Sequence, residues 1–431
     1  MDKVNEIMKW RTVVGEKIRN NSTIARNTGY LTIIECIRLL LPFVALPYII
    51  RTIGAEFYGM VAFSQAVVQY FSIFINFGFD VSVVRDVALY RNDRETLNQI
   101  VSSVLFIKTI LFLLMFGILI IGIFVIPFMS EHPMLMLFAF ITCASDLLFP
   151  IWFFQGIEKM KYITLIRSVS IVFYFFTIFI FVRQKSDYEN VALLQSLGNV
   201  VAGVISFYCI LWIENVKLQI PSFGMVKKML REALPFWFSR LSSVFINNFA
   251  KIASGFFLTM ESVAAFDLAQ KISNAVCIPT NMMSQAAYPH ISRAKNRRFA
   301  TRFLFLVGGI ALVLSILVYI LSSFIVQFFS GQDFTEAVSI LRVFCLFSFS
   351  TSMVSCTGTC VLLAFGHSRP FNMSVILATM VLVVLYLSYY VLGIKSSILF
   401  AFVLVVCDLF VLFYRLYYCY KNRLLSFSET S

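Results

Sequence analysis

The sequence predicts an all-α integral membrane protein with about twelve transmembrane helices, and three observations support this. Of the 431 residues, 60% are hydrophobic and only 13% are charged, whereas a soluble protein carries about 25% charged residues. The apolar residues form blocks long enough to cross a bilayer, which takes about 20 residues per helix. None of these blocks shows the alternation of an outer-membrane barrel strand, so helices are the structure that satisfies the backbone in lipid.

Twelve apolar blocks follow one another along the chain. The first starts near Tyr30, after a basic polar segment, and no small-residue cleavage site follows it, so we expect no removable signal peptide. The blocks cover approximately residues 30–50, 58–80, 100–127, 134–155, 162–182, 191–213, 232–256, 262–289, 302–328, 336–364, 371–392 and 396–418.

The basic residues predict the orientation of these helices. With the N-terminus inside, the inner loops and tails hold 24 Lys and Arg residues and the outer loops hold 4. Short cytoplasmic loops carry such an excess in membrane proteins, so both termini are predicted to be cytoplasmic. The net charge of +13 is therefore explained by topology, and no nucleic-acid partner is expected.

The longest polar interruption, residues 214–231, divides the twelve blocks into two sets of six. The predicted organisation is a basic cytoplasmic segment at 1–29, an N-lobe at 30–213, a cytoplasmic linker at 214–231, a C-lobe at 232–418 and a cytoplasmic tail at 419–431.

The two halves resemble each other around the second and eighth blocks. Glu56 and Glu261 stand 205 residues apart, and each is followed by a small residue three positions on and by Gln nine positions on (Gly59 and Gln65, Ala264 and Gln270). Six helices per half is an even number, so both halves start on the same side of the membrane. This predicts a parallel repeat about a pseudo-twofold axis along the membrane normal.

The segment LPFVALPYIIRTIGAEFYG, residues 41–59, resembles the start of bacterial polysaccharide-unit flippases. Similar family features are Gly78-Phe-Asp80 with Arg85-Asp86, and Leu234-Pro-Phe-Trp-Phe-Ser-Arg240 with Asn247, Asn248 and Lys251. The group that this chain resembles is the Wzx-type O-antigen flippases of the multidrug/oligosaccharidyl-lipid/polysaccharide exporter superfamily.

The resemblance implies a V-shaped pair of lobes, alternating access and a bacterial inner-membrane location. It also implies transfer of undecaprenyl-diphosphate-linked oligosaccharide from the cytoplasmic to the periplasmic leaflet. The expected partners are this lipid-linked oligosaccharide, membrane lipids and the polysaccharide polymerase machinery. Whether the polymer is O-antigen, capsule or another surface polysaccharide is left open.

Ionisable residues inside the blocks are the candidate site residues. Such a residue at the centre of a membrane helix costs roughly 2.5–3.5 kcal/mol, so it normally faces protein or water. Arg and Lys bind phosphate, which predicts a cationic cavity for the diphosphate. Lys108 and Arg167 are expected near cytoplasmic helix ends, with their charges reaching the interface. The predicted cavity cations are Arg38, Arg240, Lys251, Lys271 and Arg342.

Four acidic residues in the blocks have two open interpretations. Glu35, Asp146, Asp267 and Asp408 can serve H⁺ or Na⁺ coupling, or they can neutralise the cations. Glu35 precedes Arg38 by three residues and Asp267 precedes Lys271 by four, so each pair can form on one helix.

Other functions are less well supported by the sequence. The alternative is a cation-coupled multidrug antiporter of the same superfamily, but the blocks hold seven basic and four acidic residues, whereas cationic drugs favour acidic cavities. A membrane-embedded polymerase or ligase would need a large outer loop, and the longest one here is about 183–190. No phosphate-binding loop or metal-ligand spacing is present, so we expect no enzyme, no cofactor and no metal site.

Overall fold

A computed structural model describes residues 41–425, and all of the regular structure in this range is helical. The basic segment at 1–29 and the candidate residues Glu35 and Arg38 lie outside the described residues.

The first half of the chain begins with a helix at Leu41–Ile53. It continues with α2 (Ala55–Asn76), α3 (Phe79–Tyr90), α4 (Arg94–Val125), α5 (Pro127–Glu131), α6 (Pro133–Leu148), α7 (Ile151–Gly156), α8 (Met160–Phe181), the 3₁₀ turn η1 (Lys185–Asp187), α9 (Tyr188–Tyr208) and the π-helical turn η2 (Cys209–Ile213).

The second half consists of α10 (Phe223–Phe257), α11 (Met260–Ala294), α12 (Arg297–Ile320), α13 (Ser322–Ser330), α14 (Thr335–Cys356), the π-helical turn η3 (Thr357–Leu363), α15 (Ser368–Val391) and α16 (Ser397–Lys421).

These helices confirm the predicted all-α membrane fold. Nine helical segments of the described chain are long and apolar enough to cross a membrane. The helix at Leu41–Ile53 is apolar, but its described part is short. Helices α10 and α11 have 35 residues each and are long enough to cross a membrane, but they are more polar than the nine segments. With these three, the twelve predicted helices are accounted for.

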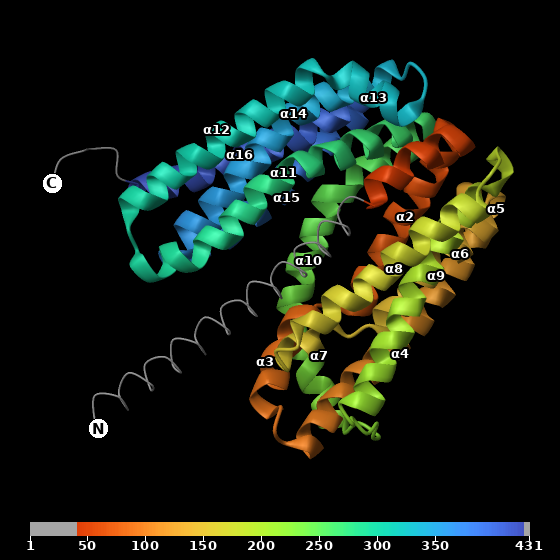
Figure 1. Cartoon of the computed structure of the whole chain (residues 1–431), viewed down its shortest axis with the longest axis vertical. Helices are drawn as coiled ribbons and strands as arrows, with labels where there is room; N and C mark the ends of the chain where they lie inside the picture. Colours follow the sequence, from red (N-terminus) through yellow and green to blue (C-terminus); the bar gives the residue numbers. More distant parts are fainter. Residues whose placement is uncertain (1–40, 426–431) are drawn as a thin grey trace, which may run out of the picture.

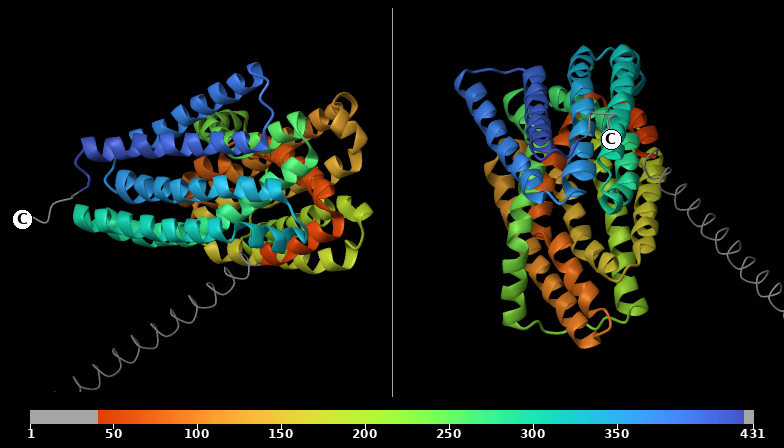
Figure 2. Two further views of the ribbon diagram at one scale, coloured as in Figure 1. Left: turned by 90° about the horizontal axis from the view of Figure 1, so that it is seen from above. Right: turned by 90° about the vertical axis from the view of Figure 1, so that its left-hand side faces the viewer.

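The helices form two bundles, which we call the first lobe (α2–α9) and the second lobe (α11–α16) (Figure 1). The lobes meet at the end that carries α5 and α13 and diverge toward the opposite end, and the views of Figure 2 show the same two bundles from other sides. This matches the V shape implied by the resemblance, while the pseudo-twofold repeat and the exact domain boundaries stay predictions.

Helix α10 joins the two lobes. It begins at Phe223, inside the predicted linker, where the Ser222 side chain accepts a hydrogen bond from the backbone N–H of Met225 at 3.3 Å. Met229 and Ala233, in its first half, belong to the hydrophobic core of the first lobe. Near the middle of α10, the backbone of Trp237 approaches Gly78 closely, because Gly78 has no side chain. The last turns of α10 face the second lobe, where the rings of Phe249 and Tyr386 lie 4.8 Å apart.

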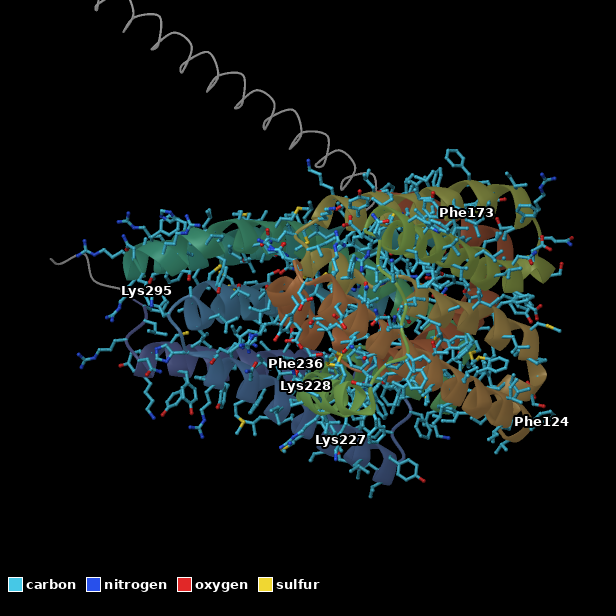
Figure 3. All side chains as sticks on the ribbon, turned by 90° about the horizontal axis from the view of Figure 1, so that it is seen from below. Phe124, Phe173, Lys227, Lys228, Phe236 and Lys295 are labelled. Atoms are coloured by element: carbon cyan, nitrogen blue, oxygen red, sulfur yellow. The ribbon has the colours of Figure 1, made fainter. Side chains whose placement is uncertain are left out.

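A predicted cytoplasmic loop and the predicted outer end of a helix lie at opposite ends of the molecule. Figure 3 shows Lys295 and Phe124 at opposite ends of the molecule. Lys295 ends α11 in a predicted cytoplasmic loop, and the exposed Phe124 is at the predicted outer end of α4. Sidedness itself stays a prediction.

Candidate functional site

A charged cluster lies where α2, α10 and α11 meet, and we call it the junction cluster. Its centre is the carboxylate of Asp267 on α11, whose side chain is only 4% exposed. The ammonium of Lys251 on α10 lies 2.7 Å from one carboxylate oxygen, and that of Lys271 lies 2.8 Å from the other. Tyr58 on α2 donates its hydroxyl to the Asp267 carboxylate and accepts a hydrogen bond from Lys271 at 2.8 Å. One carboxylate therefore links the two lobes.

The junction cluster carries a surplus positive charge. Two lysines surround one aspartate, and the side chain of Lys271 is 41% exposed whereas that of Lys251 is 13% exposed. Because Asp267 is shared, Lys271 keeps donor capacity for another anion. The cluster is therefore both a contact between lobes and an accessible cationic position.

Close packing of two small residues brings Tyr58 to Asp267. A Cβ added at Gly59 would lie 1.7 Å from the carbonyl oxygen of Met260 and 3.3 Å from the backbone nitrogen of Ala264. Gly59 and Ala264 are the small residues of the predicted repeat. Contact between equivalent positions is what a twofold axis through this crossing would produce.

Polar side chains continue from the junction cluster along α10 and α11. On α10, Arg240, Asn247 and Lys251 are separated by seven and four residues, which places them on one helix face. On α11, Asn274 follows Lys271 by three residues, and both are at least partly exposed. These polar faces explain why the two helices are less apolar than an ordinary membrane span, and polar faces at membrane depth normally meet protein or water.

The structure brings some of the predicted cations together and separates others. Lys251 and Lys271 meet at Asp267, while Arg240 is exposed and has no hydrogen-bond partner among residues 41–425. Arg342 lies elsewhere: its Nε donates to Ser322 Oγ at 3.2 Å, and its guanidinium is 5.7 Å from the ring centre of Tyr319. Arg342 thus packs against α12 and α13 rather than against the junction cluster.

Asp146 belongs to a polar network inside the first lobe. Ser72 donates its hydroxyl to the Asp146 carboxylate, and Lys108 donates to Asn76 Oδ1 at 2.7 Å and to the backbone carbonyl of Asp146 at 2.9 Å. Lys108 is 1% exposed, so the expectation that its charge reaches the interface was wrong. It lies fourteen residues after Arg94, the first residue of α4, which is about 21 Å along the helix and beyond the interface.

Asp408 belongs to a second network, between α14 and α16. Thr351 and Ser350 donate hydroxyls to its carboxylate, the latter at 3.3 Å. Two turns further along α16 is Arg415, which donates to the carbonyl of Val354 at 2.7 Å. Arg415 is one of the 24 basic residues counted on the predicted inner side, but it is 3% exposed within α16, so counting it as a tail charge was wrong.

Tyr58 was missed as a site residue at the sequence level. The available signal was its position beside Gly59 in the segment that resembles the flippases. The amide pair Gln65 and Gln195 was also missed as a contact, because the two residues are 130 positions apart and meet only when α2 packs on α9.

The fold and the charged junction define a two-lobed, multi-pass membrane transporter. Residues 24–295, more than half of the chain, match the family described as Polysaccharide biosynthesis protein. The chain belongs to this family, and the resemblance to Wzx-type flippases is confirmed.

Relatives of this chain include proteins described as O-antigen transporters. A protein of Escherichia coli (strain K12) described as "Putative O-antigen transporter" is 28% identical over 368 residues, covering 83% of this chain and 88% of that protein. A protein of Shigella dysenteriae with the same description is 26% identical over 281 residues, covering 64% and 69%.

Solved structures share the fold. The lipid II flippase MurJ in an inward closed conformation superposes with a TM-score of 0.74 at 15% identity, covering 91% of this chain and 87% of that one. An inward-facing multidrug resistance transporter of the MATE family, in the MOP superfamily, gives a TM-score of 0.68 at 15% identity, covering 91% and 99%. At this level of identity the likeness concerns the fold alone.

Proposed function

We propose that this protein is an inner-membrane flippase that moves undecaprenyl-diphosphate-linked oligosaccharide units from the cytoplasmic to the periplasmic leaflet by alternating access. Family membership and the O-antigen relatives support the substrate class. The observation that carries the proposal is the surplus positive charge of the junction cluster, at the place where the two lobes meet.

The head group explains why cations are needed there. A diphosphate bearing sugars is strongly hydrated, and hydrocarbon offers no partner for its charges. Lys271, Lys251 and Arg240 provide charge-assisted hydrogen bonds to phosphate oxygens. The spacing of Arg240 and Lys251 along α10, eleven residues or about 16 Å, gives the anion two successive positions on one helix face.

Competition for lysine gives a mechanism for coupling binding to motion. In this structure Asp267 holds both lysines, and Tyr58 of the first lobe is bound to the same carboxylate. A diphosphate that binds Lys271 and Lys251 takes over the partners of Asp267 and so weakens the contact between α2 and α11. A ligand shifts a conformational equilibrium through such differences in affinity between two states.

Ion coupling and further partners belong to the same proposal. Asp146 and Asp408 are half-buried carboxylates in separate lobes, each with hydroxyl partners, and are our candidates for H⁺ or Na⁺ coupling. Transferred units must then be joined on the outer side, so we expect the polymerase machinery as a functional partner. The alternative function, a multidrug antiporter, shares the fold with the MATE structures but requires negative rather than positive charge at the accessible site.

A deletion strain tests the proposal. We expect loss of surface polysaccharide and accumulation of lipid-linked units on the cytoplasmic leaflet, restored by the wild-type gene and poorly by Lys271→Gln at equal protein level. Normal surface polysaccharide in a deletion strain without a paralogue would refute the flippase function. Changed susceptibility to cationic dyes, with normal polysaccharide, would support the antiporter instead.

A further inference from the structure

The first lobe contains two adjoining cavities whose walls are polar. One, of about 350 Å³, lies between α2, α6, α8 and α9 with contributions from α3 and α7, and the other, of about 330 Å³, lies between α2, α6 and α9. Thr142 on α6 lines both. Each volume is within the range of about 300–1,000 Å³ that is typical of small-molecule sites.

Amide and hydroxyl groups dominate these walls. Five amide side chains from α2 and α9, together with several Ser and Thr hydroxyls, line the two cavities. The amide residues are Gln65, Gln69, Asn76, Gln195 and Asn199, and the hydroxyl residues are Ser72, Thr142, Ser145, Ser170 and Ser196. A polar group inside a membrane protein has a high free-energy cost unless it meets a polar partner. These walls therefore indicate a polar ligand.

Hydrogen bonds among the lining residues hold them in place. Gln65 donates to Gln195 Oε1 at 2.6 Å, and Ser170 donates to Asn199 Oδ1 at 2.9 Å. An amide has two donors and an acceptor with two lone pairs, so one bond leaves capacity for a ligand. The exposed Gln69 makes no hydrogen bond to another residue of the described chain.

The formal charges around the cavities balance. The larger cavity is lined by the carboxylates of Asp80 and Asp146 and by the guanidinium of Arg167. The ammonium of Lys108 is bonded to Asn76 and to the Asp146 carbonyl at the same wall. Among residues 41–425, these two anions and two cations leave no net charge, in contrast to the surplus positive charge of the junction cluster.

We propose that these two cavities bind uncharged sugar residues of the transported oligosaccharide, while the junction cluster binds its diphosphate. The proposal rests on the flippase function above. A sugar is a dense array of hydroxyl groups that both donate and accept hydrogen bonds, and amide and hydroxyl side chains match this pattern. A free phosphate would not be favoured by a charge-balanced wall, and an apolar drug would leave the amides unpaired.

One face of α2 connects the two subsites. Gln65 follows Tyr58 of the junction cluster by seven residues, or two helical turns, and Ser72 follows by a further seven. Gln65 is therefore about 10 Å along the helix from Tyr58. The first sugar is bonded directly to the diphosphate, so neighbouring subsites on one helix face fit the geometry of the head group. Figure 1 shows α2 and α8 on the side of the first lobe toward the second lobe.

Binding to the purified full-length protein in detergent tests this assignment with two probes. The first is undecaprenyl diphosphate without sugars, and the second is the same lipid carrying the host's own oligosaccharide unit. We expect wild-type protein to bind the sugar-bearing lipid more tightly. Thr142→Val and Gln69→Leu together should weaken binding of that lipid about ten-fold, because two hydrogen bonds to the sugar are lost. The same double change should leave binding of the bare lipid unchanged.

The control is Thr177→Val, an identical exchange on α8 whose hydroxyl bonds only the carbonyls of its own helix. Gln69→Leu alone is an exposed change and provides a folded variant if Thr142→Val lowers protein yield. Unaltered affinity of the Thr142 and Gln69 variants for the sugar-bearing lipid, or equal loss for both lipids, would overturn the sugar subsite. Failure of the wild-type protein to bind either lipid would instead refute the flippase function.

Discussion

Asp267 shows at the residue scale what the sequence predicts and what packing adds. Its pairing with Lys271 follows from the i, i+4 spacing on one helix, and the structure confirms it at 2.8 Å. The second partner, Lys251, is sixteen residues away on α10, and neither helical periodicity nor charge counting identifies it. The third partner, Tyr58, comes from the other lobe. The local pattern therefore predicted one of the three partners of Asp267, and the other two depend on tertiary structure.

Removing the charge of Asp267 should destabilise the protein. Asp267→Asn leaves two lysines without their shared carboxylate, and breaking a buried ion pair costs about 3–5 kcal/mol. We expect a lower midpoint of thermal unfolding in detergent and a lower protein level in membranes. Adding Lys251→Met to Asp267→Asn should recover part of the loss, because only one lysine then remains unpaired.

The matched control is Glu261→Gln, which removes an exposed carboxylate from the first turn of the same helix. It should change the unfolding midpoint little, since exposed charges contribute weakly. Equal midpoints for Asp267→Asn and Glu261→Gln would show that the junction cluster adds no stability.

At the scale of elements, the polar character of α10 and α11 is the informative feature. Both were predicted as apolar blocks, at 232–256 and 262–289, and both are helices, but 35 residues long with polar faces. Their start and end points are set by caps: Ser222 begins α10, Thr259 begins α11, and Lys295 in the left-handed conformation ends α11. The capping residues are visible in the sequence, whereas the packing of α10 against the first lobe at Gly78 is not.

The crossing of α2 and α11 should depend on Gly59. A methyl group at this position would overlap the backbone of Met260, so Gly59→Ala forces the helices apart, and overpacking of this kind costs about 1–3 kcal/mol. We expect a lower unfolding midpoint and impaired polysaccharide display. Gly117→Ala on α4 is the control, because a Cβ there meets nothing within 4 Å and helix propensity favours Ala. Similar midpoints for the two variants would contradict the close crossing.

At the scale of the whole molecule, composition predicted the class and twelve helices, because bilayer thickness and backbone hydrogen bonding allow few alternatives. The depth of single charges was harder to predict. Lys108 and Arg415 were placed near the interface or in a tail, yet both are buried and bonded to backbone carbonyls of neighbouring helices. A sequence reports where a charge lies along the chain, while its partners come from helices that fold against it.

The arrangement of the whole chain across the membrane gives the last prediction. With Arg415 removed from the inner count, 23 basic residues remain on the predicted cytoplasmic side against 4 on the other, so the excess that orients the protein is unchanged. In full-length protein, we expect Ser186→Cys to react with a membrane-impermeant thiol reagent in intact spheroplasts. Asn92→Cys and Asn422→Cys should react only after the membrane is opened.

Background labelling should be low, because the eight cysteines of the described chain are all buried, and the unsubstituted protein measures what remains. Ser186 is in the turn before α9, and Asn92 is in the turn between α3 and α4. Between these two turns the chain crosses the membrane three times, through α4, α6 and α8, so they must be on opposite sides. If Ser186→Cys and Asn92→Cys were labelled from the same side, one of these helices would not span the membrane. If Asn422→Cys were labelled in intact spheroplasts, the C-terminus would be in the periplasm.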